Sequence, residues 1–160
     1  MIGFKKLNGA AINWLLLPSL LALDQASKVW VERTLELGEK WPIIPGLFNL
    51  TRVHNYGIAF GLFQGYGNWV AIAAFLIFCG VLFWIWRKVD WSSWSNNMIA
   101  ALILSGAVGN WIDRARLGYV IDFADFHIGP HHWPAFNVAD SCVCIAIGWL
   151  MLLIFKGKDS

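Results

Sequence analysis

Charged side chains are scarce in this sequence. Asp, Glu, Lys and Arg make up 14% of its 160 residues, whereas a soluble domain carries about a quarter. Hydrophobic residues make up 58%, and the mean hydropathy is +0.57. This composition argues against an ordinary soluble domain and is typical of a protein in a lipid bilayer. The net charge is only +2, and no basic cluster with interleaved aromatic residues occurs, so we expect no nucleic-acid partner.

Cysteine is scarce as well. Cys79, Cys142 and Cys144 all lie in apolar runs, outside the polar loops where a disulfide framework forms. We interpret them as small packing residues. The alternative, a thiol nucleophile at Cys142 or Cys144, lacks a histidine nearby in the sequence.

Apolar runs are abundant. A bilayer-spanning helix needs about 20 apolar residues, and four runs are candidates. They cover about residues 11–30, 68–86, 97–113 and 136–155. No repeat or second domain is visible, so we predict a single integral membrane domain over residues 1–160. The first run resembles a signal peptide but continues to Lys28 without a small-residue cleavage site, so we expect a retained helix.

Basic residues beside the predicted spans indicate the orientation. With four spans, one side receives the basic residues packed into short flanks: Lys5, Lys6, Arg87, Lys88, Lys156 and Lys158. The other side carries the same number of basic residues, but these are spread over long loops or lie in helix ends. By the positive-inside rule, we expect both termini to be cytoplasmic.

The segment between the first two predicted spans has a β pattern. Residues 47–53 alternate in polarity, Asn55–Gly57 is a turn signal, and 58–63 is a candidate return strand. We expect a small extracytoplasmic β element at about 43–63. The predicted fold class is therefore an all-α membrane protein: four transmembrane helices, with this β element between the first and second.

Uncommon polar residues gather at one depth of the predicted bilayer. Asp140 lies roughly 6 Å below the outer end of the fourth span, and Asp24 lies roughly 18 Å above the inner end of the first. Asn110, Asp122 and Asn55 fall at the same level. Ionisable groups in membrane segments are costly and usually mark a site, and two neighbouring aspartates can share one proton as acid and base.

Some of these residues also have a purely structural interpretation. Asp24 and Lys28 are spaced i,i+4 on one helix face, so they form either a structural ion pair or part of the site. Asp113 and Arg114 at a helix end fit an ordinary interfacial pair. Asn137 either caps the fourth helix or binds a substrate.

Five short motifs occur in a recognisable order along about residues 24–141. They are Asp24-Gln25-x-Ser27-Lys28, Asn55-x-Gly57-x-Ala59-Phe60, Gly109-Asn110-x-x-Asp113-Arg114, Val120-x-Asp122-Phe123 and Phe136-Asn137-x-Ala139-Asp140-Ser141. Together with the length and the four-span layout, they resemble the bacterial lipoprotein signal peptidases, also called signal peptidase II.

The resemblance implies an aspartic protease of the bacterial cytoplasmic (inner) membrane. It cuts signal peptides from prolipoproteins before a diacylglyceryl-modified cysteine and needs no metal or other cofactor. Asp122 and Asp140 would be the catalytic pair. The residues implied to bind substrate or support the site are Asp24, Lys28, Asn55, Gly57, Asn110, Arg114 and Asn137. The implied partners are the lipidated prolipoprotein and membrane lipid, with the enzyme acting as a monomer.

Two positions depart mildly from the family pattern. Ile58 stands where many members have a small residue, which would narrow the groove. Ser105 stands where glycine is common, which affects helix packing: Ala101, Ser105 and Gly109 form a small-residue stripe.

Three other functions fit the sequence less well. A zinc enzyme would use Asp125 and the histidines between 127 and 132, but no HExxH-like spacing aligns them. A proton-coupled transporter would use Asp24, Asp122 and Asp140 as a relay, but it lacks the inverted repeat of such proteins. A membrane scaffold would leave Asp122 and the asparagines unexplained.

Overall fold

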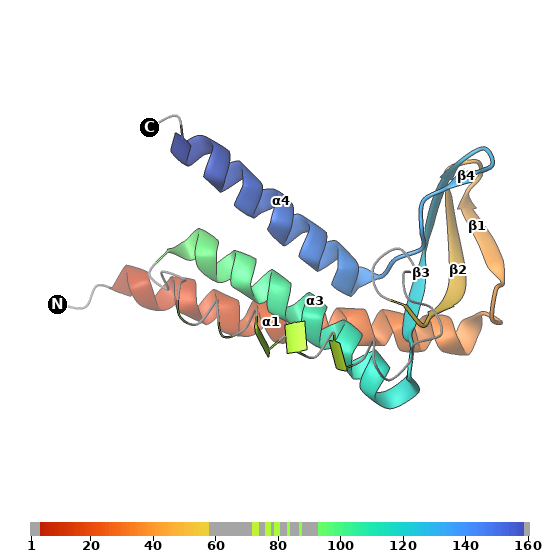
Figure 1. Ribbon diagram of the computed structural model, residues 1–160, viewed down its shortest axis with the longest axis horizontal. Helices are drawn as coiled ribbons and strands as arrows, with labels where there is room; N and C mark the ends of the chain where they lie inside the picture. The colour runs from red at the N-terminus through yellow and green to blue at the C-terminus, as the bar shows by residue number, and fades with distance from the viewer. Residues whose placement is uncertain are drawn as a thin grey trace.

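The computed structural model describes residues 4–57 and 93–158, together with residues 72–73, 76–77, 79–80, 83 and 87 between them. The described elements are three helices and a four-stranded sheet (Figure 1). The helices are α1 (Phe4–Thr34), α3 (Trp94–Leu117) and α4 (Val138–Lys158). The strands are β1 (Lys40–Ile44), β2 (Phe48–Asn55), β3 (Val120–Ile128) and β4 (His131–His132).

Local signals in the sequence set the ends of α3. Ser93 is its N-cap, and its hydroxyl accepts a hydrogen bond from the Asn96 backbone N–H at 3.5 Å. Gly118 ends the helix in the left-handed conformation, with φ of 81°, and its N–H donates to the Arg114 carbonyl. A left-handed residue after the last turn is the usual way to end a helix, and glycine adopts it without strain. The short turn at Gly118 leads directly into β3.

The sheet is antiparallel with strand order β1-β2-β3-β4. β1 and β2 form a hairpin, but β2 also pairs with β3, which lies beyond α3 in the chain. In Figure 1 the sheet stands at one end of the molecule, beside the C-terminal part of α1 and beyond the N-terminal end of α4. The sheet therefore joins the ends of α1, α3 and α4 on one side of the molecule.

Two apolar clusters hold these parts together. Val31 and Leu35 of α1 pack with Leu50 and Ile121 of the sheet. The second cluster lies between α3 and α4 and consists of Ile99, Leu102, Cys142 and Ala146. Because α1 and α3 each contact both the sheet and another helix, the strand ends and helix ends are held at one junction.

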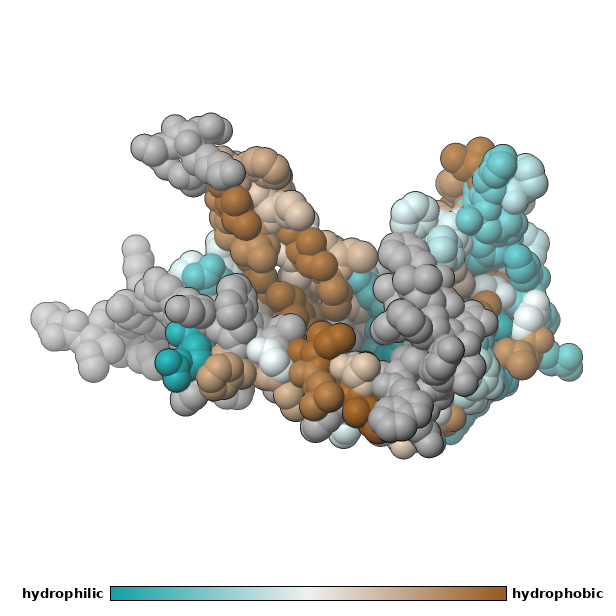
Figure 2. Space-filling view, viewed as in Figure 1, coloured by the Kyte–Doolittle hydropathy of each residue, from teal (hydrophilic) through white to brown (hydrophobic). Residues whose placement is uncertain are grey.

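The predicted fold class was wrong. The described residues are not all-α: they contain a four-stranded sheet, half of which comes from the segment between α3 and α4. Among the described helices, α4 alone is long and apolar enough to cross a membrane, with a mean hydropathy of 2.3 over Val138–Phe155. The polar and charged residues carried by α1 and α3 lower their hydropathy. Figure 2 shows hydrophobic residues along α4 and mostly hydrophilic residues over the sheet.

Two predicted segments fall largely outside the described residues. They are the second span at 68–86, of which only a few helical positions between 72 and 83 are described, and the return strand at 58–63. The strand predicted at 47–53 exists as β2, but its described partners are β1 and β3. Sequence patterns indicate that a segment is a strand, but the choice of a distant partner is a tertiary property.

Candidate active site

The two aspartates singled out in the sequence line one pocket. Asp122 lies on β3 and is 2% exposed. Asp140 lies in the first turn of α4 and is partly buried. The pocket has a volume of about 880 Å³ and is bounded by α3, α4 and the residues that precede α4. Two carboxyl groups far apart in the chain thus face the same cavity.

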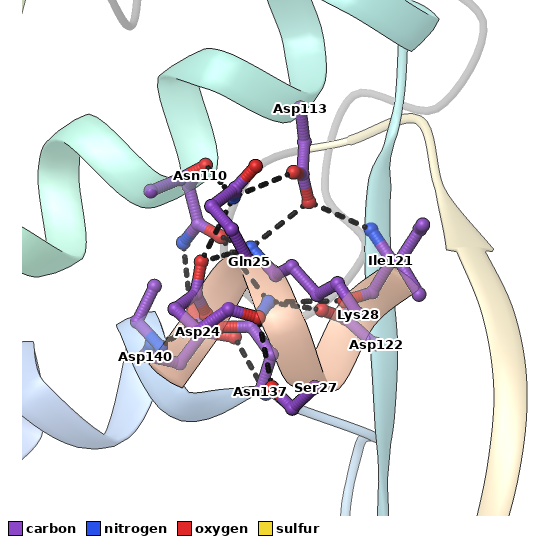
Figure 3. A network of polar contacts seen from close by, with 12 residues as sticks. Asp24, Gln25, Ser27, Lys28, Asn110, Asp113, Ile121, Asp122, Asn137 and Asp140 are labelled. Carbon is purple, nitrogen blue, oxygen red and sulfur yellow. Dashed lines mark hydrogen bonds and ion pairs between the residues drawn. The ribbon is translucent and has the colours of Figure 1, made fainter. Parts of the chain in front are cut away.

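Two asparagine side chains connect these carboxyl groups (Figure 3). The Asn137 Nδ2 donates to the Asp122 Oδ1 at 2.7 Å and to the Asn110 Oδ1 at 3.2 Å. The Asn110 Nδ2 in turn donates to the Asp140 Oδ1 at 2.8 Å. The orientation of each amide is therefore set by its neighbour, and together they hold the two carboxyl groups in a defined relation.

Asp122 holds its proton more tightly than an ordinary aspartate. Burial and the nearby Asp140 carboxylate raise the pKa of Asp122 to about 7, against the opposing effect of hydrogen bonds from Asn55 and Asn137. The Asn55 Nδ2 donates to the Asp122 Oδ2 at 2.9 Å. The Asp122 carboxyl can therefore act as an acid near neutral pH.

Asp140 takes its position from the helix that carries it. The Asp140 backbone N–H donates to the Asn137 Oδ1 at 2.9 Å, and the Asn137 N–H donates to the Asp140 Oδ2 at 3.2 Å. This reciprocal pair has the geometry of a capping box, with aspartate in the place of the usual glutamate. The predicted capping role of Asn137 is thus confirmed, and the same residue contacts Asp122.

A buried ion triad of Lys28, Asp24 and Asp113 lies next to the residues that hold Asp122 and Asp140. The Lys28 Nζ lies 2.9 Å from the Asp24 Oδ2 and 2.9 Å from the Asp113 Oδ2. It also donates to the Asn110 Oδ1 at 3.0 Å. All three charged side chains are at most 3% exposed. The predicted Asp24–Lys28 pair exists, but Asp113 pairs with Lys28 and not, as expected, with Arg114.

The triad reaches the backbone beside each candidate catalytic residue. The Asp24 Oδ1 accepts from the Ala139 N–H at 2.9 Å, one residue before Asp140. The Asp113 Oδ2 accepts from the Ile121 N–H at 3.2 Å, one residue before Asp122. Gln25 joins the network by donating to both carboxylates and to the Gly109 carbonyl. The triad therefore binds the backbone of both β3 and the start of α4, and so helps to fix the distance between them.

Arg114 and the turn at residues 55–57 lie at the rim of the pocket. The Arg114 Nη2 donates to the Gly57 carbonyl at 2.8 Å, and its Nη1 donates to the Asn110 carbonyl at 3.4 Å. The Asn55 Oδ1 accepts from the Gly57 N–H at 2.9 Å, which closes the turn predicted there. Every site residue predicted from the sequence thus lies in one connected region.

Sequence reasoning missed the walls of the pocket. One wall is the segment 133–136, which contributes Trp133, Pro134, Ala135 and Phe136. Along α3 and α4 the lining is apolar and includes Ile103, Ala107, Val143, Cys144 and Ile147. Cys144 follows Asp140 by one helical turn, a spacing that could have indicated its place. Segment 133–136 carries no comparable signal, because its position depends on pairing with β3.

The histidines of the β3–β4 hairpin form no metal site within the described residues. No group of three or more His, Cys, Asp or Glu side chains there is placed to hold a metal ion. Instead, His132 bonds to Asp125, and the rings of His127 and His132 stack with centroids 4.7 Å apart.

The chain matches a known protein family over most of its length. The profile of the family described as Signal peptidase (SPase) II matches residues 16–156. A lipoprotein signal peptidase of Geobacter metallireducens is 45% identical over 140 residues, covering 86% of each chain. A lipoprotein signal peptidase of Shewanella piezotolerans is 39% identical over 156 residues, covering 95% of this chain and 91% of the relative.

Two solved structures have the same overall fold. Both are described as bacterial membrane enzymes. One has a TM-score of 0.81 at 26% identity, covering 92% of this chain and 90% of its own. The other has a TM-score of 0.79 at 27% identity, covering 91% of this chain and 94% of its own.

Proposed function

The chain belongs to the signal peptidase II family, and we propose that it is an aspartic endopeptidase that removes signal peptides from prolipoproteins, cutting before a diacylglyceryl-modified cysteine. Membership makes the chain a peptidase, and its relatives and solved neighbours make it a membrane protein. The finer statements, namely the aspartic mechanism, the lipidated substrate and the site residues, are the proposal. The observation that carries it is the pair Asp122 and Asp140, joined through two asparagines at one pocket.

In this mechanism the pair shares one proton. Because burial and the Asp140 charge raise the pKa of Asp122 to about 7, Asp122 carries the proton below neutral pH. The proposal assigns the negative charge to Asp140, whose carboxylate accepts hydrogen bonds from the Asn110 side chain and the Asn137 N–H. One carboxyl group is thereby an acid and its partner a base.

The reaction uses one water molecule. Asp140 removes a proton from this water as its oxygen attacks the scissile carbonyl carbon. Asp122 donates a hydrogen bond and then its proton to the carbonyl oxygen, which gives a neutral tetrahedral diol. As the carbon–nitrogen bond breaks, the proton on Asp140 passes to the leaving nitrogen. A diol proton returns to Asp122, so the pair ends with the single proton it began with.

The remaining polar residues hold the substrate backbone and the pair. Arg114 and Asn55 lie at the rim, where their unused N–H groups suit peptide carbonyls. Asn110 and Asn137 orient the carboxyl groups, while Asp24 and Lys28 support them. Below the pair, the apolar lining along α3 and α4 suits the hydrophobic part of a signal peptide entering from the bilayer. The acyl chains of the modified cysteine would remain in lipid.

We place the enzyme in the bacterial inner membrane as a single domain with both termini in the cytoplasm. The site then lies near the outer leaflet, where a translocated prolipoprotein presents its lipidated cysteine. We expect the enzyme to act as a monomer, because one chain contributes all the polar groups named above.

The test is cleavage of a lipid-modified prolipoprotein by the purified protein in detergent. Wild type is expected to release the signal peptide. Asp122→Asn and Asp140→Asn keep the side-chain size but remove the ionisable group, so each should lose at least about 100-fold in rate. Glu39→Gln makes the same chemical change beside the sheet and away from the pocket, and it should retain activity.

Two outcomes of this experiment would contradict the proposal. If one aspartate variant keeps most of its activity while folding normally, the catalytic pair is misassigned. If wild type leaves both lipidated and unlipidated substrate intact, the proposed activity is wrong and a transport function becomes the leading alternative.

A further inference from the structure

One buried carboxylate connects all four strands of the sheet, and the mechanism above does not use it. Asp125 of β3 is 4% exposed. Its Oδ1 lies 2.6 Å from the His132 Nδ1 on β4. Its Oδ2 accepts from the Asn49 Nδ2 on β2 at 3.1 Å and lies 3.1 Å from the Lys40 Nζ on β1. Each of the other three strands thus contributes one contact to this carboxylate.

The surroundings keep Asp125 charged. Burial alone would raise its pKa, but hydrogen bonds from His132, Asn49 and Lys40 outweigh burial and lower the pKa below its ordinary value. The His132 ring is held on a second side, since it stacks on His127 with an interplanar angle of 15°. The Asp125–His132 contact is therefore a charged, geometrically defined anchor for β4.

The anchor lies directly before a wall of the proposed active site. The residue after His132 is Trp133, and segment 133–136 lines the pocket. The Trp133 N–H donates to the Phe126 carbonyl at 2.7 Å, and the Phe136 N–H donates to the Ala124 carbonyl at 3.1 Å. Between these two hydrogen bonds lie Pro134, which has no N–H, and Ala135. The backbone hydrogen bonds to β3 that hold the wall are thus at its two ends, Trp133 and Phe136. The Asp125–His132 contact holds the residue that directly precedes Trp133.

The catalytic pair does not share this dependence. Asp122 and Asp140 are held by Asn55, Asn110, Asn137 and the Lys28 triad, none of which contacts Asp125 through a described hydrogen bond. Loss of the Asp125 anchor should therefore move the wall without moving the pair.

We propose that Asp125 is a positioning residue for substrate: through His132 it holds segment 133–136 as the wall against which the signal peptide binds. This inference rests on the proposed function, because it assigns the wall to substrate binding. It differs from a structural role for Asp125, which would change the amount of folded enzyme but not its affinity for substrate.

The kinetic test compares KM with kcat. Asp125→Asn keeps the size and one oxygen acceptor but removes the charge, and His132→Phe keeps a ring but removes the donor. Each should raise KM for the lipidated prolipoprotein by about tenfold and leave kcat within about twofold of wild type. The double variant should be no worse than the more impaired single variant, because both substitutions act on the same Asp125–His132 contact. Lys40→Met, which removes only the exposed contact, should resemble wild type.

An activity-independent measurement completes the test. Hydrogen–deuterium exchange of the peptide covering residues 130–136 should be faster in Asp125→Asn than in wild type, with exchange in α3 and α4 unchanged. Unchanged exchange in that peptide overturns the inference even if wild type shows no peptidase activity. Faster exchange throughout the sheet, a fall in kcat at constant KM, or additive single variants would each overturn it while leaving the proposed function standing.

Discussion

Asn137 shows how much one residue does in this site. Its side-chain oxygen caps α4 at the Asp140 N–H, and its side-chain nitrogen donates to Asp122. It also donates to the Ile121 carbonyl at 3.3 Å and to Asn110. It is 1% exposed, so its side-chain amide is held by protein groups and not by bulk water. The same residue therefore caps α4 and holds the proposed catalytic Asp122.

The raised pKa of Asp122 predicts a pH dependence. The acid form of this group is present below about pH 7 and is lost as the pH rises through that value. Because the proposed mechanism needs that proton, kcat/KM for prolipoprotein cleavage should fall as the pH rises above about 7. The measurement is the cleavage rate at low substrate concentration across a pH series, with Glu39→Gln as control. A rate that stays constant from about pH 6 to about pH 9 would contradict Asp122 as the acid.

Lys28 predicts a large effect on stability. Lys28→Met leaves Asp24 and Asp113 buried without their cation, and breaking such a buried network typically costs about 3–5 kcal/mol. The apparent Tm in detergent should therefore drop strongly. Lys40→Met removes the half-exposed partner of Asp125 and should cost no more than about 1 kcal/mol. Equal Tm values for the two variants would mean that the triad does not support the fold.

At the scale of elements, α3 depends on closely packed small residues. Ala101, Ser105 and Gly109 form the stripe predicted from the sequence, and all three are buried. A Cβ on Gly109 would lie 2.6 Å from the Asp24 Oδ2 and 3.2 Å from the Ala139 Cβ. A Cβ on Gly106 would collide with the Ala139 carbonyl oxygen. The absence of these Cβ atoms lets Asp24 reach the start of α4.

Gly109→Ala should therefore disturb both packing and catalysis. We expect a loss of about 1–3 kcal/mol from overpacking and reduced cleavage, because Asp24 can no longer hold the Ala139 N–H. The matched control is Gly148→Ala in α4, where an added Cβ meets nothing within 4 Å. Thermal unfolding and cleavage of both variants decide the question, and an unaffected Gly109→Ala enzyme would refute the argument.

At the scale of the whole molecule, the sheet and the two termini lie at opposite ends of the helices (Figure 1). The C-terminal end of α4 points away from the sheet, and the apolar stretch Val138–Phe155 runs from the pocket, which its first half lines, toward that end. If α4 crosses the bilayer, the sheet and the C-terminus must lie on opposite sides of the membrane.

With the proposed topology, the sheet lies outside the cytoplasm and the C-terminus lies in the cytoplasm. In a variant lacking Cys79, Cys142 and Cys144, a thiol introduced by Pro130→Cys should react with a membrane-impermeant maleimide applied to spheroplasts. A thiol introduced by Asp159→Cys should react only after the membrane is opened. The reverse pattern would invert the proposed topology, and reaction of both thiols before opening would argue against a crossing by α4.

Patterns local in the chain accounted for much of this protein. Long apolar runs predicted helices where α1, α3 and α4 occur, and the i,i+4 spacing of Asp24 and Lys28 predicted their ion pair. The ordered motifs indicated the family and identified the two aspartates that face one pocket, although their catalytic role is still a prediction. These features are readable because helical period, run length and motif order depend on residues near one another in sequence.

The tertiary structure alone decided the rest. The pairing of β2 with β3 made a sheet where an all-α fold was predicted. The packing of α1 against α3 brought Asp113 to Lys28, and hydrogen bonds to β3 hold segment 133–136 at the pocket that Asp140 lines. The sheet also gathered a partner for Asp125 from each of its other three strands. Such contacts join residues far apart in the chain. Many pairings are compatible with the same local pattern, and the one that forms depends on how all the helices and strands pack together.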